Sequence, residues 1–240
     1  MTKVIHIVYQ SYPNVSGSST RTRSILLAQK AAGIGVAVVS APGQAPQIPK
    51  NARGKESHEG IIYHRSYLIR GAQVAQKKSS LNRLKKILAF PYFVWRVFSV
   101  SRQERPDVLH AHAMFYCAIA ALISGRLLSI PVVYEIRSIW YKNSGADLQS
   151  RTQRLAARFE NFAVRRVSGF VAISDGIART FSLLRQDIVI VRNAVSVHDI
   201  TLPDLTAGHP PKTFGYIGSV ITLEGIDMVI KTFGKVKRAE

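Results

Sequence analysis

The sequence predicts an α/β fold in which helices cover both faces of a parallel sheet. Short apolar or β-branched runs alternate with helix-length segments along most of the chain. Hydrophobic residues make up 47% of the 240 residues, which is enough to bury a sizeable core. Strands that alternate with helices of this length favour a parallel sheet.

Seven segments are expected as strands, because each is a short apolar run bounded by Gly, Pro, Asp or Ser. They are Val4–Tyr9, Val36–Ser40, Ile61–Arg65, Val108–Ala111, Val132–Ile136, Phe170–Ile173 and Ile188–Arg192. Helices are expected between them at Thr20–Ala32, Met114–Leu128, Gln153–Val167 and Asp175–Leu184. Gly33 is the expected C-terminal cap of the first helix, and Ser174 is the expected N-terminal cap of the last.

A change of pattern near residue 202 predicts a domain boundary. The segment 202–212, LPDLTAGHPPK, is rich in proline and reads as a linker. A strand at Thr213–Ile217 and a helix at Leu223–Val236 are expected after it. One strand and one helix cannot bury their apolar faces alone. We therefore expect a first domain at 1–201, a linker at 202–212, and the start of a second domain, cut short, at 213–240.

The chain is strongly basic, with 33 Lys and Arg against 14 Asp and Glu, a formal charge of +19. This excess favours an anionic partner, which can be nucleic acid, acidic lipid or a phosphorylated substrate. No nucleic-acid reader motif is recognisable, so nucleic acid is not the expected partner. The single cysteine, Cys117, excludes an internal disulfide framework and suits a reducing compartment. No signal peptide and no membrane-spanning segment are visible, so a cytoplasmic location is expected.

Polar residues stand just past the ends of two expected strands. His110 and His112 end one strand, and Glu135 and Arg137 end the next. In open α/β sheets, ligands bind at this edge. The two histidines point the same way from an extended segment, and three interpretations stay open: a metal site, a ligand contact, or simple packing.

The first loop carries a second candidate site at Gly17-Ser18-Ser19-Thr20. Backbone amides at the start of a helix bind phosphate or a sugar hydroxyl, and glycine lets a ligand approach closely. The alternative is that Gly17 is a plain turn glycine. No dinucleotide fingerprint and no P-loop occurs in the chain.

Two basic segments are candidate membrane surfaces. In Lys77–Arg105, lysines and arginines interleave with aromatic residues, which suits a helix pair lying in a membrane interface. The alternative is an ordinary helix whose apolar face joins the core. A second stripe is formed by Arg151, Arg154, Arg158 and Arg165, which is typical of a solvated helix face and enlarges the positive field.

Several motifs, taken in order, resemble the family 4 glycosyltransferases of the GT-B fold. They are PDVLHAH, IPVVYEIRSIW, FVAISDGI, IVIVRNAV and FGYIGSVITLEGID. The EIRSIW and GSVITLEGID forms look most like a branch associated with bacterial exopolysaccharide and exosortase systems. The resemblance implies two Rossmann-like domains facing a cleft. The first takes the acceptor and the second takes a nucleotide diphosphate sugar, which is a co-substrate. It also implies a retaining reaction of the hexosyltransferase type, without metal or cofactor.

The resemblance assigns roles to individual residues. His112 matches the histidine that contacts the donor sugar and is the expected catalytic residue. Gly17, with Ser18 beside it, would lie near the donor phosphate, and Arg137 and Ser174 would line the acceptor-side cleft. Asn193 matches the asparagine of the family's Pro-Asn-Gly-Val-like turn, although Ala194 follows it here. Gly218 would offer helix N-terminal amides to the diphosphate.

The sequence departs from the family pattern at two further site residues. Ser219 and Glu224 stand where the family has an arginine and a lysine facing the diphosphate. Preorganised charge stabilisation of this kind contributes roughly 3 to 4 kcal/mol per group. We expect sugar transfer to a lipid-linked or polysaccharide acceptor in cell-surface polysaccharide synthesis, at the inner face of the plasma membrane. The alternative is a non-catalytic module that binds a membrane or a polysaccharide.

Overall fold

The computed structural model describes residues 1–14, 16–42, 54–66, 80–139, 150–194, 215–218 and 224–234. The chain forms two compact units, Met1–Asn193 and Ala194–Glu240, and each is described here by itself. The predicted linker at 202–212 lies outside the described residues. The domain limits inferred from the sequence therefore stay a prediction.

The first unit is built on one eight-stranded sheet with the order β3-β4-β2-β1-β5-β6-β7-β8. The strands are β1 Lys3–Val8, β2 Gly35–Ser40, β3 Lys55–His58, β4 Ile61–Arg65, β5 Val108–His112, β6 Val132–Ile136, β7 Gly169–Ala172 and β8 Ile188–Ile190. All neighbouring strands are parallel except β3 and β4. The predicted α/β fold with a parallel sheet is therefore confirmed, with one antiparallel strand added at its edge.

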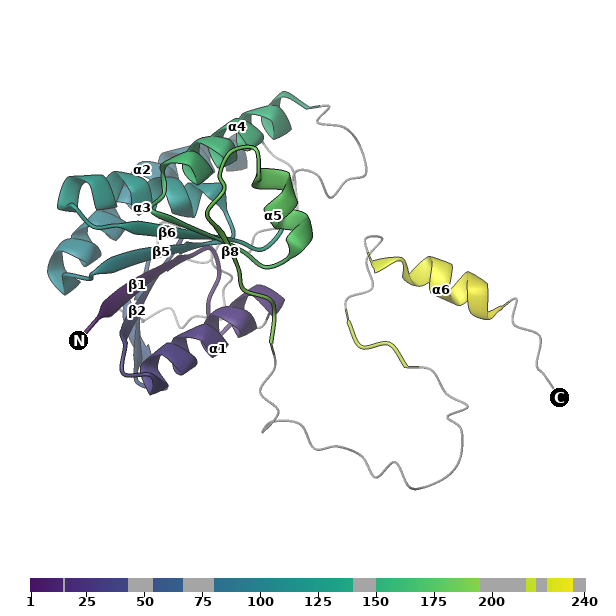
Figure 1. Cartoon of the computed structure of the whole chain (residues 1–240), viewed down its shortest axis with the longest axis horizontal. Helices are drawn as coiled ribbons and strands as arrows, with labels where there is room; N and C mark the ends of the chain where they lie inside the picture. Colours follow the sequence, from purple (N-terminus) through teal and green to yellow (C-terminus); the bar gives the residue numbers. More distant parts are fainter. Residues whose placement is uncertain are drawn as a thin grey trace, which may run out of the picture. The chain divides into compact units, whose positions relative to one another are not determined.

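Helices cover both faces of this sheet. In the first unit they are α1 Gly17–Ala31, α2 Ser80–Glu104, α3 Phe115–Leu128, α4 Arg151–Arg166 and α5 Asp175–Phe181. In Figure 1, α2, α3 and α4 lie on one side of the sheet and α1 lies on the other. The core follows this division, because one apolar cluster joins the sheet to α2, α3 and α4, and a smaller one joins it to α1.

Helix α1 begins at Gly17, earlier than the predicted start at Thr20. Ser16 caps it, and the Ser16 hydroxyl accepts from the Ser19 backbone N–H while the Ser19 hydroxyl accepts from the Ser16 N–H. This capping box satisfies donors that a helix start leaves unpaired. The loop singled out in the sequence is thus the first turn of a helix.

Helix α2 corrects one part of the expectation for Lys77–Arg105, the helix pair, while the membrane contact stays a prediction. It is one continuous helix that contains Pro91. Phe93, Val97 and Val100 are all 1% exposed or less and pack into the larger apolar cluster. The apolar face of this segment therefore joins the core, as the alternative interpretation held. Lys77 and Lys78 lie outside the described residues.

Along β1 and β5, one face of the sheet is apolar, and the other carries a polar region of three histidines beside the small apolar cluster under α1. Ile5, Ile7, Leu109 and Ala111 belong to the cluster under α2 and α3. The intervening residues, His6, His110 and His112, belong to the opposite face, because successive side chains of a strand alternate. That polar region lies where the strand order changes direction, since β1 connects through α1 to β2 and borders β5 on its other side.

The described part of the second unit contains one helix, α6, at Ile226–Phe233. The strand predicted at Thr213–Ile217 is not formed by residues 215–217, which pair with no described strand. A lone extended segment has no partner for its backbone groups, and this is the physical reason for the difference. Among the described helices of either unit, none is both long and apolar enough to cross a membrane.

Candidate functional site

Three histidines from two neighbouring strands meet in the polar region of the sheet. His6 of β1 is in register with His110 of β5, and His112 lies two residues further along β5. The ring centroids of His110 and His112 are 4.0 Å apart, and each lies 5.1 Å from the ring of His6. The cluster stands near the carboxyl ends of parallel strands at a switch point of the topology, the place where open α/β sheets bind ligands.

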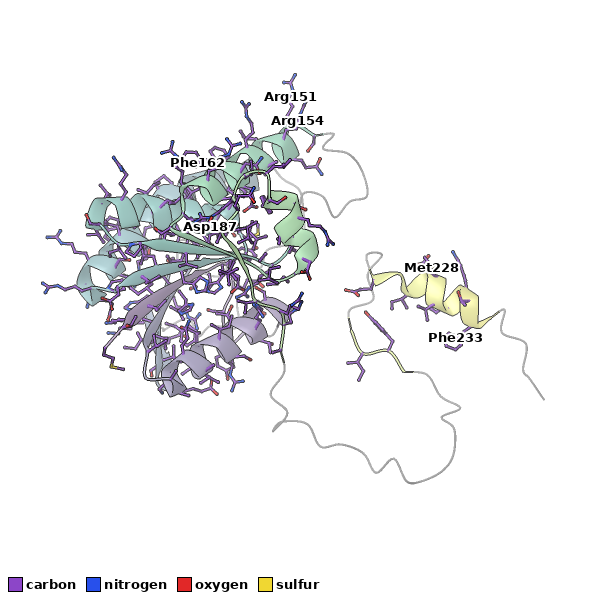
Figure 2. The ribbon with its side chains drawn as sticks, viewed as in Figure 1. Arg151, Arg154, Phe162, Asp187, Met228 and Phe233 are labelled. Atoms are coloured by element: carbon purple, nitrogen blue, oxygen red, sulfur yellow. The ribbon has the colours of Figure 1, made fainter. Side chains whose placement is uncertain are left out.

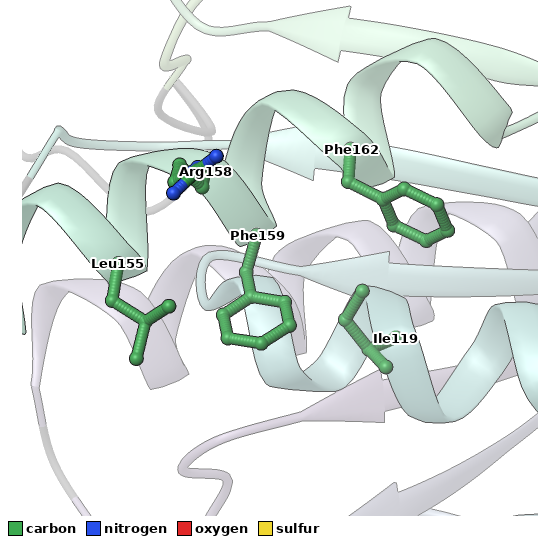
Figure 3. Close-up of a pocket in the computed structure, with 5 residues that line it drawn as sticks. All are labelled: Ile119, Leu155, Arg158, Phe159 and Phe162. Carbon is green, nitrogen blue, oxygen red and sulfur yellow. The ribbon is translucent and has the colours of Figure 1, made fainter.

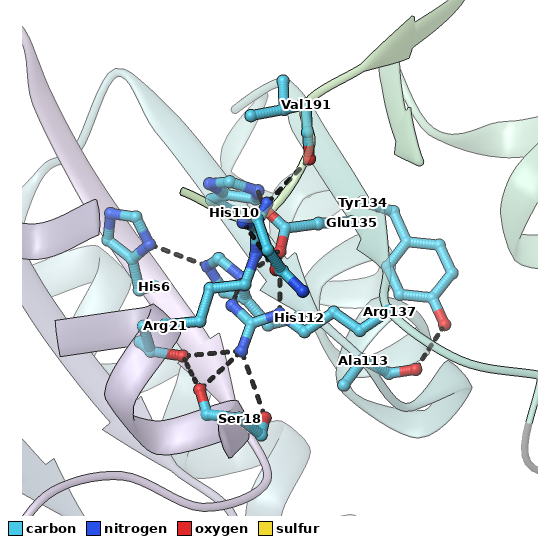
Figure 4. A network of polar contacts seen from close by, with 12 residues as sticks. His6, Ser18, Arg21, His110, His112, Ala113, Tyr134, Glu135, Arg137 and Val191 are labelled. Atoms are coloured by element: carbon cyan, nitrogen blue, oxygen red, sulfur yellow. Dashed lines mark hydrogen bonds and ion pairs between the residues drawn. The ribbon is translucent and has the colours of Figure 1, made fainter. Parts of the chain in front are cut away.

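A chain of hydrogen bonds fixes the tautomers of two of these histidines (Figure 4). Arg137 Nη2 lies 2.8 Å from His112 Nδ1, and His112 Nε2 lies 2.8 Å from His6 Nδ1. His6 Nε2 lies 2.8 Å from Gln29 Oε1. A guanidinium only donates, so His112 Nδ1 accepts and the proton of this imidazole stands on Nε2. His6 then accepts at Nδ1 and donates from Nε2 to the Gln29 carbonyl oxygen.

The pKa values of the histidines agree with this assignment. Burial, the largest cause, lowers the pKa of His6 and of His112 to about 3, and it lowers the pKa of His110 well below its usual range. All three imidazoles are therefore neutral at pH 7. A neutral imidazole donates once and accepts once, and the chain from Arg137 to Gln29 requires this pattern at His112 and at His6.

Glu135 supplies the negative charge of the site. Its Oε1 accepts from Arg137 Nε over 2.7 Å and from Arg21 Nε over 3.1 Å. Burial alone would raise the pKa of this carboxyl, but its contacts with charged groups, Arg137 foremost, outweigh burial and hold the pKa well below its usual range. Two guanidiniums share one carboxylate, so the site carries a net positive charge and favours an anionic ligand.

The two arginines connect the sheet edge to its surroundings. Arg137 Nη1 donates to the Ser18 backbone oxygen over 2.6 Å and to Thr22 Oγ1 over 2.9 Å, both in the first turns of α1. Arg21 Nη1 donates to Asn193 Oδ1 over 3.0 Å, and Arg21 Nη2 donates to the Val191 backbone oxygen over 3.0 Å. The start of α1, the end of β6 and the segment after β8 are thereby held together.

Four of the site residues predicted from the sequence meet in this network: His112, Arg137, Ser18 and Asn193. Gly17 adjoins Ser18 at the start of α1, and a Cβ atom placed on it would have nothing within 4 Å. The first turn of α1 contains no acidic residue. The positive end of the helix dipole and an open glycine therefore stand beside the two arginines.

The other predicted residues are not brought into the network by any described contact. Ser174 caps α5, and its hydroxyl accepts from the Ile177 backbone N–H over 3.4 Å. Gly218 and Glu224 belong to the second unit, and Ser219 lies outside the described residues. His112 itself is only 1% exposed, and both of its ring nitrogens are engaged.

Sequence reasoning missed His6, Arg21, Thr22 and Gln29 and gave no role to Glu135. Two of them carried a signal. His6 and Glu135 are polar residues inside otherwise apolar strands, and a polar residue in that setting needs a partner when buried. The residues of α1 gave none, because their contacts depend on which sheet face the helix covers.

The histidine cluster does not fit a metal ion. One ligand atom from each of His6, His110 and His112 lies within 4.8 Å of the others, a set that zinc accepts in principle. However, Arg137 donates to His112 Nδ1, so His112 Nε2 carries a proton and offers no lone pair to the cluster. Two neighbouring guanidiniums also oppose a dication. The expectation that no metal takes part stays a prediction.

A family model described as "Glycosyl transferase 4-like domain" matches residues 16–214. Among solved structures, a sucrose-phosphate synthase from Thermosynechococcus elongatus aligns with a TM-score of 0.60 at 10% identity, covering 82% of this chain and 49% of that one. A UDP-GlcNAc 2-epimerase from Neisseria meningitidis, bound to UDP-GlcNAc, aligns with a TM-score of 0.47 at 13% identity, covering 79% and 46%. MurG from Acinetobacter baumannii aligns with a TM-score of 0.43 at 13% identity, covering 72% and 41%.

These likenesses concern the fold. The chain spans about half the length of the solved structures that it matches, 49% of the synthase and 46% of the epimerase. No curated protein matches the chain by sequence.

Proposed function

Because this chain belongs to the Glycosyl transferase 4-like family, we propose that it forms the acceptor-side half of a retaining glycosyltransferase. The donor is a nucleotide diphosphate sugar, and no metal or cofactor takes part. The acceptor is a lipid-linked or polysaccharide chain in cell-surface polysaccharide synthesis, at the inner face of the plasma membrane. The motif forms of the exopolysaccharide and exosortase branch support this choice of acceptor.

One observation carries the proposal. The start of α1 and the guanidinium of Arg137 converge at the carboxyl ends of β5 and β6, and Arg137 Nη1 lies 2.6 Å from the Ser18 backbone oxygen. A helix start and a net positive charge at a switch point suit a phosphorylated ligand. The amides near Gly17 would face the leaving diphosphate. The sequence also predicts helix N-terminal amides at Gly218, but the described helix of the second unit begins at Ile226.

His112 is proposed to orient the donor sugar by a hydrogen bond. Its geometry adds a condition to this role, because Nδ1 already accepts from Arg137 and Nε2 is directed to His6. A sugar hydroxyl can replace the guanidinium at Nδ1 only if Arg137 releases that bond. His112 would otherwise act through Arg137, as a residue that positions the guanidinium. No enzymatic nucleophile is proposed.

A second candidate function is a non-catalytic module that binds a polysaccharide or a membrane. The observation that favours it is the chemistry at Ser219 and Glu224, which replace the cations expected to face a diphosphate. A glutamate there repels the donor unless another group compensates.

Turnover separates the two candidates. Nucleotide sugars are supplied with a lipid extract, and transfer and hydrolysis are followed for the chain and for a version joined to a complete donor-side domain. We expect transfer by the joined version and a loss of at least tenfold in His112→Ala, assayed well below the melting temperature of this variant, which is lowered because the histidine side chain is buried and hydrogen-bonded. The absence of any turnover, together with saturable polysaccharide binding, would favour the module instead.

A further inference from the structure

A shallow apolar groove lies between α3 and α4, on the opposite layer from the histidine cluster (Figure 3). It has a volume of about 350 Å³ and is lined by Ile119, Leu155, Arg158, Phe159 and Phe162. Leu155, Phe159 and Phe162 keep 53%, 43% and 49% of their surface exposed. These three residues are spaced at one helical face, so they form a continuous apolar strip along α4.

The strip adjoins a stripe of arginines on the same helix. Arg151, Arg154, Arg158, Arg165 and Arg166 are all exposed, and Figure 2 shows Arg151 and Arg154 projecting from the start of α4. The one acidic residue of α4, Glu160, is buried. None of the five arginines makes an ion pair with a described residue. The outward face of α4 therefore offers aromatic and aliphatic surface beside uncompensated positive charge.

We propose that this face of α4, with the groove between α3 and α4, docks on an anionic phospholipid surface. Arginines pair with headgroup phosphates, while Leu155, Phe159 and Phe162 enter the acyl boundary, as in helices that lie in a membrane interface. The groove gives an acyl chain a place between Ile119 and the two phenylalanines. This proposal rests on the proposed function only for the location at a membrane. It assigns the membrane contact to α4 instead of Lys77–Arg105.

Charge decides between this occupant and a second copy of the chain. A copy would place arginine against arginine, since the chain carries a formal charge of +19. An anionic bilayer supplies both phosphate and hydrocarbon, which are the two chemistries that the face presents. Phe162 already lies under a cation, with the Arg166 guanidinium 5.5 Å from its ring centroid. Such pairs hold the arginine near the apolar strip.

Cosedimentation with vesicles of equal parts phosphatidylglycerol and phosphatidylcholine tests the proposal on the full chain. The charge variant is Arg151→Gln with Arg158→Gln, and its matched control is Arg23→Gln with Lys30→Gln on α1, across the sheet. Each arginine lost from the docking face should weaken partitioning about fivefold, hence roughly 25-fold for the pair. The control should change it less than threefold, and added salt should weaken the wild type.

The apolar variant is Leu155→Ser with Phe162→Ser, and its control is Leu183→Ser, at an exposed leucine that follows α5. We expect a loss of about fivefold or more for each groove side chain and no change for Leu183→Ser. Because Leu155, Phe162 and Leu183 are exposed, melting temperatures of these variants should stay close to the wild type. A melting scan checks this, and it also checks the charge control, in which Arg23 is half-buried and pairs with Glu59.

Three results would overturn the proposal. They are equal binding by the groove variants and their controls, binding that does not need phosphatidylglycerol, and a dimer that the groove variants abolish. These failures leave sugar transfer untouched, since transfer to a soluble acceptor is measured without vesicles. Conversely, if the chain binds vesicles but transfers no sugar, the docking proposal is supported and the transferase proposal fails.

Discussion

The Nη2 atom of Arg137 lies 2.8 Å from Nδ1 of His112, and this contact fixes where the imidazole carries its proton. A guanidinium has no lone pair to offer, so His112 must accept at Nδ1 and donate from Nε2 to His6. Nitrogen NMR of the labelled chain at pH 7 should show His112 and His6 neutral, each protonated at Nε2. A charged imidazolium, or an Nδ1–H tautomer at His112, would refute the hydrogen-bond chain.

Arg137→Lys should destabilise the first unit although it keeps the charge. A lysine ammonium cannot reach Glu135, Ser18 and His112 at once, because it lacks the planar fork of five donors. Glu135 is 2% exposed, and losing a buried hydrogen bond to a charged group costs about 1.5 to 3 kcal/mol. Urea unfolding measures the effect. Arg179→Lys on exposed α5 is the control and should change stability by less than about 0.5 kcal/mol. Equal losses of stability in the two variants would mean that the guanidinium hydrogen bonds of Arg137 do not stabilise the first unit.

Stability should rise with pH between about 3 and 6.5 because of the buried histidines. Burial lowers the pKa of His6 and His112 from 6.5 to about 3. In this window the unfolded chain binds protons that the folded chain does not, so acidification favours unfolding. The full stabilisation is present above pH 6.5 and is lost as pH falls toward 3. Denaturant titrations in a pH series measure the slope, and a flat profile would contradict the neutral cluster.

Glu160 should lower stability as pH rises, opposite to the effect of the histidines. The substitution Glu160→Gln separates the two contributions. Burial raises its pKa from 4.5 to about 7, Tyr134 donates to its Oε1, and its Oε2 has no hydrogen-bond partner among the described residues. The unfolded chain therefore loses this proton first, and the stability that Glu160 contributes falls as pH rises from 4.5 to 7. Removing the carboxyl should steepen the rise caused by the histidines, by about 1.4 kcal/mol per pH unit. An identical slope in the variant would show that Glu160 titrates normally.

Helix α2 offers a test of whether its apolar face belongs to the core. Phe93 is 1% exposed, whereas Trp95 on the same helix is 56% exposed. Phe93→Ala should cost about 3 to 5 kcal/mol through lost burial and a cavity. Trp95→Ala should cost less than about 1 kcal/mol. Comparable losses at the two positions would contradict the packing of α2 on α3, as thermal or urea unfolding would show.

The parallel strands were predictable because a strand that is buried on both faces of the sheet must be apolar along its length. The predicted strand Val132–Ile136 has the same bounds as β6. It did not predict β3, Lys55–His58, whose segment KESH has no apolar alternation and pairs only at the sheet edge with β4. A short polar edge strand lacks the hydrophobic alternation by which a strand is predicted from sequence.

The candidate site was predictable in part, at the ends of two strands and at the first loop, where Ser18 lies. His112 and Arg137 stand at positions where ligands bind in this class of sheet. Arg21 was not predictable, because its partners Glu135 and Asn193 lie on other elements and far along the chain. Its role depends on how α1 crosses the sheet, which no local pattern encodes. The same applies to Gln29, whose amide completes the chain of hydrogen bonds at His6.

The central claim is that the start of α1 faces the phosphorylated donor, and Gly17→Val tests it most directly. The structure has room for the new side chain, since nothing lies within 4 Å of a Cβ on Gly17. Ala28→Val, at an exposed position further along α1, is the control. Transfer from nucleotide sugars, assayed with the chain joined to a complete donor-side domain, should fall at least tenfold in Gly17→Val and stay within twofold in Ala28→Val. Full transfer by Gly17→Val, with its melting temperature unchanged, would contradict the account.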